Sequence, residues 1–403
     1  MHTVQEALET ILSRAKPLGM ERVELLESFG RILGQEIIAD IDLPPFDNTA
    51  VDGYAVRSQD TAGASREIPV RLSVIDELSA GDKPMRIIGE GKSIKIMTGA
   101  PIPYGADAVV MVEDTERHGD MVSVYTALHP GGNIRHAAEE MSAGTVVLSP
   151  GIRIRPSEIA LLAALGNSQP LVYKQPRAAL FSTGDELVDV GAAAPPYGKI
   201  RDSNLPTLAA LAAAAGAEIL SMKRLPDSLP DTIALLRESS EMGADMIITA
   251  GGVSVGDRDY VRLALESLGR LELWKVAMKP GKPLAFGSIG RSLFLGLPGN
   301  PISVQVTFEL FARPALWKQM GRSKLERPVV RARLADSLKH STGRDEYVRA
   351  ITIWNGAGYI TRSTGAQGSS ILSSMTLANS LLLFPADIPL LNAGDEAEVM
   401  MLE

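Results

Sequence analysis

Residues 292–310 read SLFLGL-PGNP-ISVQVTFEL, which is an apolar run, a tight turn and then a helical pattern. A short apolar run that ends at Pro and Gly predicts a buried strand. Asn300 suits the cap in front of a helix and Pro301 suits its first position, so we expect a helix to begin there. The stretch therefore predicts one strand–loop–helix step of an α/β fold.

The same alternation continues on both sides of this step. Upstream, DMIITA (245–250) is followed by a glycine- and acid-rich loop and by the helical pattern DYVRLALESLG (259–269). Strands that alternate with helices of about 10–15 residues predict a mostly parallel sheet covered on both faces. We therefore expect a three-layer α/β domain over 175–325. Its other predicted segments are the strands AALFST (178–183) and EILSMKRL (218–225) and the helices NLPTLAALAAAAG (204–216) and LPDTIALLRESSEMG (229–243).

Three further domains are expected around it. Residues 1–44 show helical periodicity through Val4–Leu12 and again through Val23–Ile32, and with 141–174 they predict a discontinuous linker domain. Short alternating stretches over 45–140 predict an inserted β domain. Residues 326–403 predict a small C-terminal β domain. The chain is thus expected to be a multidomain α/β protein.

Four loops of the α/β domain should carry chemistry, because ligands bind beyond the carboxyl ends of parallel strands. A helix that begins at Asn300-Pro301 offers backbone N–H groups to an anion, although PGNP taken alone is more simply a tight turn. Glycines in the other loops also have a plain steric explanation. The candidate backbone positions for substrate binding are Gly251, Gly252, Ser254, Gly256, Pro298, Gly299, Asn300 and Pro301.

Acidic residues gather in the same loops. One surface acid usually serves solubility, but five at one sheet edge favour Mg²⁺ held between carboxylates and phosphate oxygens. These five are Asp185, Glu186, Asp227, Asp257 and Asp259.

Lysines stand in a stiff loop just upstream of the PGNP strand. The sequence WKVAMKPGKP (274–283) places Lys275, Lys279 and Lys282 among prolines and a glycine. Three such charges could neutralise an oxyanion. The alternative is an ordinary solvated basic loop.

Composition excludes several classes of function. The 403 residues include no cysteine, which removes thiolate chemistry and iron–sulfur clusters and fits a reducing cytoplasm. A net charge of −8 argues against a nucleic-acid partner, and no apolar run approaches the ~18 residues of a membrane span. The N-terminus lacks the basic start of a signal peptide. Gly91-Lys92-Ser93 resembles the end of a phosphate-binding NTPase loop but lies in a predicted strand.

Nine motifs in order along the chain resemble the MoeA family, the molybdopterin molybdenumtransferases, which are related to the E domain of gephyrin. The motifs are PPFDNTAVDGYAV (44–56), IMTGAPIP (96–103), GADAVVMVED (105–114), GNIR (132–135), STGDEL (182–187), GGVSVGDRDY (251–260), KPGKP (279–283), LPGNP (297–301) and LSSM (372–375).

This resemblance implies a four-part subunit that forms a homodimer, with an active cleft between the α/β domain of one subunit and the β domain of the other. The implied reaction inserts molybdenum from molybdate into adenylylated molybdopterin and releases AMP with Mg²⁺. The implied setting is the cytoplasm, with the molybdopterin adenylyltransferase as a further candidate partner and neither nucleic acid nor membrane.

Residue roles also follow from the resemblance. The implied catalytic residues are Asp52, Thr98, Glu186, Asp227, Asp259, Lys275 and Lys279. The implied molybdate ligands are Lys279, Lys282, Ser303, Arg344 and Ser369. The implied Mg²⁺ ligands are Glu186, Asp227 and Asp259.

The chain departs from the family pattern conservatively at Thr49 and Val51, which replace a common Ser and Met, and more markedly at two other places. Glu140 stands where the family commonly has Asp, and Ser370 where His is frequent, which weakens the assignment of Ser369. Two other functions stay open: adenylylation of molybdopterin with ATP, and a non-enzymatic scaffold. The sequence does not separate molybdate from tungstate, two anions of nearly equal size and charge.

Overall fold

The computed structural model describes residues 1–253, 260–340 and 343–402. It divides into two units. The first comprises 1–35, 150–160 and 168–403, and the second comprises 36–149 and 161–167. The four domain boundaries expected from the sequence stay a prediction.

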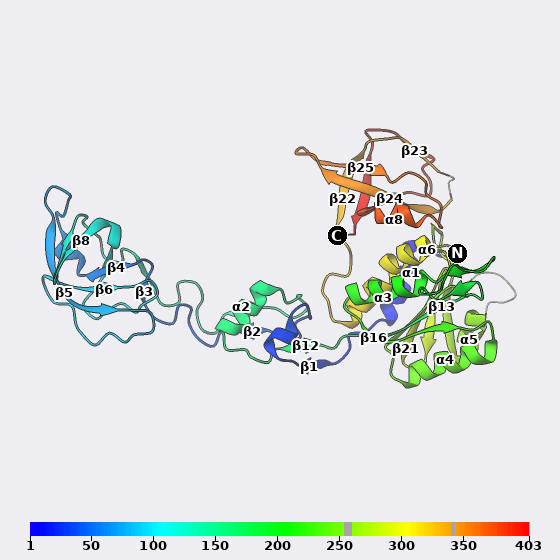
Figure 1. Ribbon diagram of the computed structural model, residues 1–403, viewed down its shortest axis with the longest axis horizontal. Coiled ribbons are helices and arrows are strands. Elements are labelled where there is room, and N and C mark those ends of the chain that lie inside the picture. The colour runs from blue at the N-terminus through cyan, green and yellow to red at the C-terminus, as the bar shows by residue number, and fades with distance from the viewer. Residues whose placement is uncertain (254–259, 341–342, 403) are drawn as a thin grey trace. The chain divides into compact units, whose positions relative to one another are not determined.

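A six-stranded sheet forms the centre of the first unit, in the order β16-β13-β17-β21-β20-β18 (Figure 1). The first four strands are parallel, and the last two join antiparallel at one edge. The predicted mostly parallel sheet is therefore confirmed. The bounds are β13 Arg177–Thr183, β16 Glu218–Leu225, β17 Met246–Ala250, β18 Gly269–Trp274, β20 Ala285–Ile289 and β21 Ser292–Leu297.

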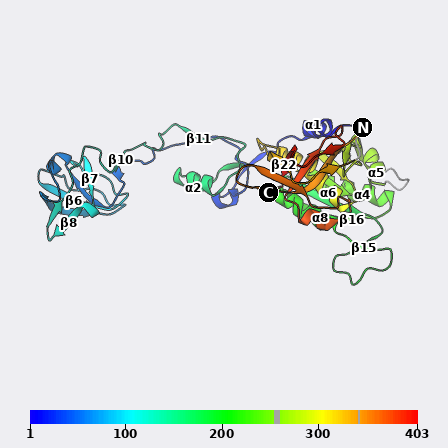
Figure 2. The same ribbon diagram turned by 90° about the horizontal axis from the view of Figure 1, so that it is seen from above.

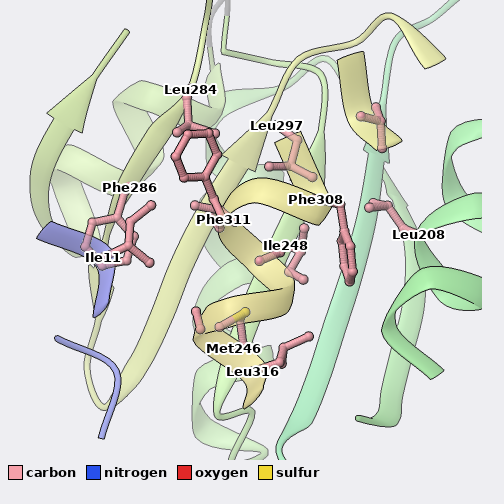
Figure 3. Close-up of a cluster of buried hydrophobic side chains, with 14 of the residues drawn as sticks. Ile11, Leu208, Met246, Ile248, Leu284, Phe286, Leu297, Phe308, Phe311 and Leu316 are labelled. Atoms are coloured by element: carbon pink, nitrogen blue, oxygen red, sulfur yellow. The ribbon is translucent and has the colours of Figure 1, made fainter. Parts of the chain in front are cut away.

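Helices cover both faces of this sheet. Successive side chains of a strand point to opposite faces, so neighbouring residues of one strand pack against different helices. Leu180 and Ile248 pack with helices α1, α3, α6 and α7 on one face, and their neighbours Phe181 and Ile247 pack with α4 and α5 on the other. Figure 3 shows Phe308 and Phe311 packed near Ile248 in the first of these layers. The helices are α1 Val4–Arg14, α3 Asn204–Ala214, α4 Leu229–Glu241, α5 Tyr260–Leu268, α6 Pro301–Thr307 and α7 Arg313–Gln319, with a π-helical turn η4 Phe308–Ala312 between the last two.

A small barrel follows, also in the first unit. Its strands run β24-β25-β22-β28-β26, and β26 pairs again with β24, which closes the sheet. Strand β19 Met278–Lys279, which lies in the lysine loop, pairs in parallel with the start of β24. The bounds are β22 Val329–Leu334, β24 Asp345–Trp354, β25 Tyr359–Ser363, β26 Ser380–Phe384 and β28 Glu396–Met401; short elements are β23 Leu338–Lys339, β27 Leu390–Leu391 and α8 Leu372–Thr376.

The N-terminal segment contains one helix rather than two. The expected second helical run over Val23–Ile32 is wrong: β1 Met20–Arg22 pairs with β12 Leu171–Tyr173, and only a 3₁₀ turn, η1 Leu25–Ser28, follows. A strand pairing between distant segments has overridden the local apolar spacing. Near α3, the short strands β14 Leu187–Val188 and β15 Ile200–Arg201 pair in parallel.

The second unit contains a six-stranded sheet in the order β7-β4-β6-β5-β9-β8 (Figures 1 and 2). Apolar residues fill both of its faces, one around Tyr54 and Val110 and the other around Ile94 and Val109. Lys92 begins β6, so the predicted strand at this pseudo-NTPase sequence is confirmed. The bounds are β2 Ile37–Ile38, β3 Asn48–Thr49, β4 Gly53–Val56, η2 Ser58–Thr61, β5 Val70–Leu78, β6 Lys92–Ile96, β7 Ala108–Met111, η3 Val112–Asp114, β8 Thr115–His118, β9 Met121–Val124, β10 Ile134–Arg135 and β11 Val146–Leu148. In the part of the chain that the structure describes, no helix is both long and apolar enough to cross a membrane.

Helix α2, Pro156–Ala164, begins with a side-chain ion pair. Glu158 accepts hydrogen bonds from the Arg155 guanidinium at 2.7 and 3.0 Å and from the Arg155 N–H at 2.8 Å. The guanidinium first, and then the backbone N–H, lowers the pKa of Glu158 from 4.5 to about 2. The stabilisation is thus complete above pH 4.5 and is lost as the pH falls toward 2.

Glu158→Gln should therefore lower the thermal unfolding midpoint at pH 7 and lower it less at pH 3. Calorimetry at the two pH values measures this, with exposed Glu326→Gln as the control. An equal loss at both pH values would show that the ionised carboxylate is not what stabilises the helix start.

Candidate functional site

A cleft of about 790 Å³ lies beyond the carboxyl ends of β13, β17 and β21 in the first unit. Loops after these strands form one wall, and the β19 loop forms another. The barrel adds Arg344 and the segment Gln367–Ser369. The strand–loop–helix pattern thus correctly predicted the edge of the sheet at which the cleft lies. It did not predict that residues of the barrel line the cleft as well.

Most of the predicted site residues in the described ranges line this cleft. They are Glu186, Gly251, Gly252, Lys279, Lys282, Pro298, Gly299, Asn300, Ser303, Arg344 and Ser369. Ser370 is not among the described lining residues. The other predicted residues fall elsewhere or outside the described ranges, as follows.

Asn300 is the cap residue of α6 and Pro301 its first residue, as predicted. The Asn300 side chain does not cap the helix, however. It donates to Ser369 Oγ at 3.0 Å, and the Ile302 N–H donates to the Ser369 carbonyl at 3.2 Å. One of the N–H groups expected to be free for an anion is therefore used to dock the barrel, and Ser369 is fixed at the cleft.

Two residues that the sequence reading did not single out hold the PGNP loop. Buried Asp202 accepts from Ser182 Oγ at 2.5 Å and from the Asn204 N–H at 2.9 Å, at the start of α3. The Asn204 side chain then donates to the Gly299 carbonyl at 2.8 Å. An Asp just before a helical run is a recognised cap signal, so the role of Asp202 at the start of the helix could have been predicted from the sequence. Its hydrogen bond to Ser182 could be seen only in the folded structure.

Gly251 and Gly252 have positive φ angles of 92° and 70°. A Cβ on Gly251 would lie 2.4 Å from Thr183 Oγ1, and one on Gly252 would lie 2.3 Å from Val261 Cγ2. The backbone after β17 therefore requires glycine both for conformation and for its close approach to β13 and α5.

The lysines of the loop divide into two groups. Lys279 and Lys282 line the cleft with Arg344. Lys275 does not appear among its described lining residues; its N–H donates to the Leu284 carbonyl at 3.0 Å, and its φ is 75°. The cleft thus has a cationic side formed by two loop lysines and one barrel arginine.

The predicted acidic residues are only partly assembled. Glu186 lines the cleft, while Asp227 follows β16 and is not among the described lining residues. Asp259, with Asp257, Ser254 and Gly256, lies outside the described residues. Within the described ranges, no three acidic or histidine side chains gather closely enough to hold a metal ion. A carboxylate at a cleft still fits Mg²⁺, which takes one or two protein carboxylates and completes its shell with substrate phosphates and water.

Asp52 and Thr98 meet in the second unit. Asp52 Oδ1 accepts from the Thr98 N–H and from Thr98 Oγ1, both at 2.7 Å. The N–H first, and then the hydroxyl, lowers the pKa of Asp52 from 3.8. The two hydrogen bonds thus favour the ionised form of the carboxylate and hold it in one orientation.

Thr98→Val should raise the pKa of Asp52 part of the way toward 3.8, because the hydroxyl is lost and the N–H remains. NMR titration of the aspartate carboxyl carbons measures the change. If Asp52 acts in catalysis, the turnover rate should also fall by up to about 10²-fold, since a misplaced group costs that much. Thr115→Val, which removes a hydroxyl bonded to the Val112 carbonyl, is the control. An unchanged rate would remove this pair from the site.

Comparison with known proteins covers nearly the whole chain. Three family models match: "MoeA N-terminal region (domain I and II)" over 2–166, "Probable molybdopterin binding domain" over 179–318 and "MoeA C-terminal region (domain IV)" over 331–402. A molybdopterin molybdenumtransferase of Haemophilus influenzae is 35% identical over 99% of this chain and 98% of its own length. Molybdopterin molybdenumtransferase 2 of Mycobacterium tuberculosis is 37% identical over 99% of both. The crystal structure of the molybdopterin biosynthesis moeA protein of Pyrococcus horikoshii superposes with a TM-score of 0.84, 32% identity and 100% coverage of both chains.

Proposed function

The chain belongs to the MoeA family and is a transferase of molybdenum cofactor biosynthesis, and from this premise we propose that it inserts molybdenum from molybdate into adenylylated molybdopterin and releases AMP. The family resemblance and multidomain α/β fold expected from the sequence motifs are confirmed. The release of AMP, the need for Mg²⁺ and the homodimer belong to the proposal.

The observation that carries the proposal is the composition of the cleft wall. Lys279, Lys282 and Arg344 face the cleft together with the polar residues Ser303 and Ser369. Molybdate is a tetrahedral dianion, and charge-assisted hydrogen bonds from lysine, arginine and hydroxyl groups are the contacts that such an anion favours. The same cations would hold the phosphates of the adenylylated pterin.

The proposed reaction requires the protein mainly to position the substrates and to neutralise their negative charge. Cleavage of the adenylyl bond is phosphoryl-type chemistry, for which positioned cations supply most of the catalysis. Gly251 and Gly299 line the cleft without side chains, so the phosphate chain would be able to approach the sheet edge closely there. Mg²⁺ would neutralise phosphate charge, and Glu186 is the described cleft carboxylate that would hold it.

Asp52 and Thr98 enter this proposal through a partner subunit. In the proposed homodimer, the second unit of one chain completes the cleft of the other, and the ionised Asp52 would orient the attacking oxygen. Action in the cytoplasm and receipt of substrate from an adenylyltransferase stay predictions from the sequence.

One incubation separates this proposal from its rival. Purified protein is given adenylylated molybdopterin, Mg²⁺ and molybdate, and AMP and molybdenum-loaded pterin are quantified by chromatography; the two products should rise together. A parallel incubation contains ATP, Mg²⁺ and unmodified molybdopterin. Accumulation of adenylylated pterin there, with no AMP release in the first, would identify an adenylyltransferase instead. No turnover in either would favour a scaffold.

A further inference from the structure

A buried carboxylate of the barrel faces the cleft lysine. Glu346, in β24, is only 4% exposed, and its Oε1 lies 2.9 Å from Lys279 Nζ. The Lys279 side chain is 42% exposed and lines the cleft. The proposed reaction gives Glu346 no role, yet a carboxylate is rarely buried without a partner that compensates its charge.

The backbone sets this pair in register. Strand β19 pairs in parallel with β24, with Lys279 opposite Glu346 and Met278 opposite Asp345. The lysine loop is thus joined to the barrel at the residue pair that forms the ion pair. A lysine side chain has a flexible four-carbon stem and about 2 kcal/mol of rotamer entropy. A fixed ion-pair partner therefore restricts the positions that the ammonium group can occupy.

His340 lies on the other side of the same carboxylate. Its Nδ1 is 3.4 Å from Glu346 Oε2, its Nε2 is 3.2 Å from the Pro385 carbonyl oxygen, and its side chain is 2% exposed. The ring packs edge-on against Phe384 with 4.1 Å between ring centres. Among the described residues, His340 Nδ1 and Glu346 Oε2 make no hydrogen bond with each other or with another group. Glu346 therefore presents Oε1 to Lys279 and has Oε2 beside the imidazole.

We propose that Glu346, which lies beside His340, is a positioning residue that holds the Lys279 ammonium where a tetrahedral oxyanion binds. Lys279 keeps two further donors for that anion, because an ammonium has three N–H groups and Glu346 takes one. The inference rests on the proposed use of molybdate in this cleft. Through Glu346, the C-terminal barrel becomes part of the oxyanion site. Glu346 is not among the described residues that line the cleft.

Isothermal titration with sodium molybdate tests this on the full-length protein. Glu346→Gln, which keeps the shape and removes the charge, should raise the molybdate Kd about tenfold. Lys279→Met should raise it further. The double variant should match Lys279→Met alone, because Glu346 acts through the lysine. Glu272→Gln is the matched control: it also removes an ion-paired carboxylate, 2.8 Å from Arg14 Nε and 11% exposed, and should leave the Kd unchanged.

The outcomes separate the inference from the proposed function. If the wild-type protein shows no molybdate binding, the oxyanion site of the proposed function is overturned. If the wild type binds but Glu346→Gln binds equally or more tightly, the carboxylate does not position the lysine, and the inference is wrong. Additive losses in the double variant would also overturn it. Should Glu346→Gln fail to fold, Glu346→Asp keeps the charge one methylene further back, and an unchanged Kd there would contradict the proposal.

Discussion

Lys279→Ala is expected to lower kcat/KM for molybdate by about 10²–10³-fold, the usual cost of removing one preorganised donor from a site where anionic charge is stabilised. Lys279 lines the cleft with Lys282 and Arg344, and its ammonium is held by a buried partner. Most of the loss should appear as a higher molybdate requirement, because the side chain contacts the anion in the ground state as well.

Steady-state AMP release at varied molybdate concentrations measures this effect. Lys324→Ala removes an exposed lysine of the same unit and is the control. A molybdate KM for Lys279→Ala within twofold of the wild type would show that this lysine does not hold the anion. The wall formed by Lys282 and Arg344 would then have to account for binding alone.

Glu309→Gln is expected to cost about 3–5 kcal/mol of unfolding free energy, because it leaves buried charge without its partner. Glu309 lies in η4 and accepts from Arg313 at 2.7 Å through both carboxylate oxygens, and Arg327 adds a bond at 3.0 Å. The side chains of Glu309 and Arg313 are 4% and 3% exposed. Two guanidinium groups would lose their compensation together.

Denaturant unfolding followed by far-UV circular dichroism gives the measurement, compared at the transition that involves the α/β domain. The chain offers a matched control in Glu266→Gln, which breaks an ion pair of the same i,i+4 spacing with Arg262 at 3.2 Å but with both side chains about 40% exposed. That exposed pair should contribute about 0.3–0.5 kcal/mol. Equal losses in the two variants would mean that burial does not decide the strength of the Glu309 pair.

Local pattern predicted the α/β elements well, for a physical reason. The runs at 246–250 and 292–297 are mainly apolar and buried at every position, because β17 and β21 are covered on both faces. Where a segment is buried on one side only or not at all, the spacing of apolar residues predicted its secondary structure less reliably. The apolar residues over Val23–Ile32 repeated at helical spacing, yet the chain there forms only a 3₁₀ turn, and the residues just before it, Met20–Arg22, pair with β12 instead.

The sequence by itself determined the strand–loop–helix steps, the glycine turns after β17 and the start of α6 at Pro301, because caps, turns and apolar periodicity act between near neighbours in the chain. Motif order also identified the family. The family resemblance already implied that Arg344 and Ser369 belong to the site, and the structure places both at the cleft. Only the tertiary structure decided that Asp202 and Asn204 anchor the PGNP loop and that Glu346 forms an ion pair with Lys279. These contacts join segments that are far apart in sequence. No local propensity encodes which strand of the barrel lies beside a given loop. The packing of the α/β domain against the barrel decides that neighbour.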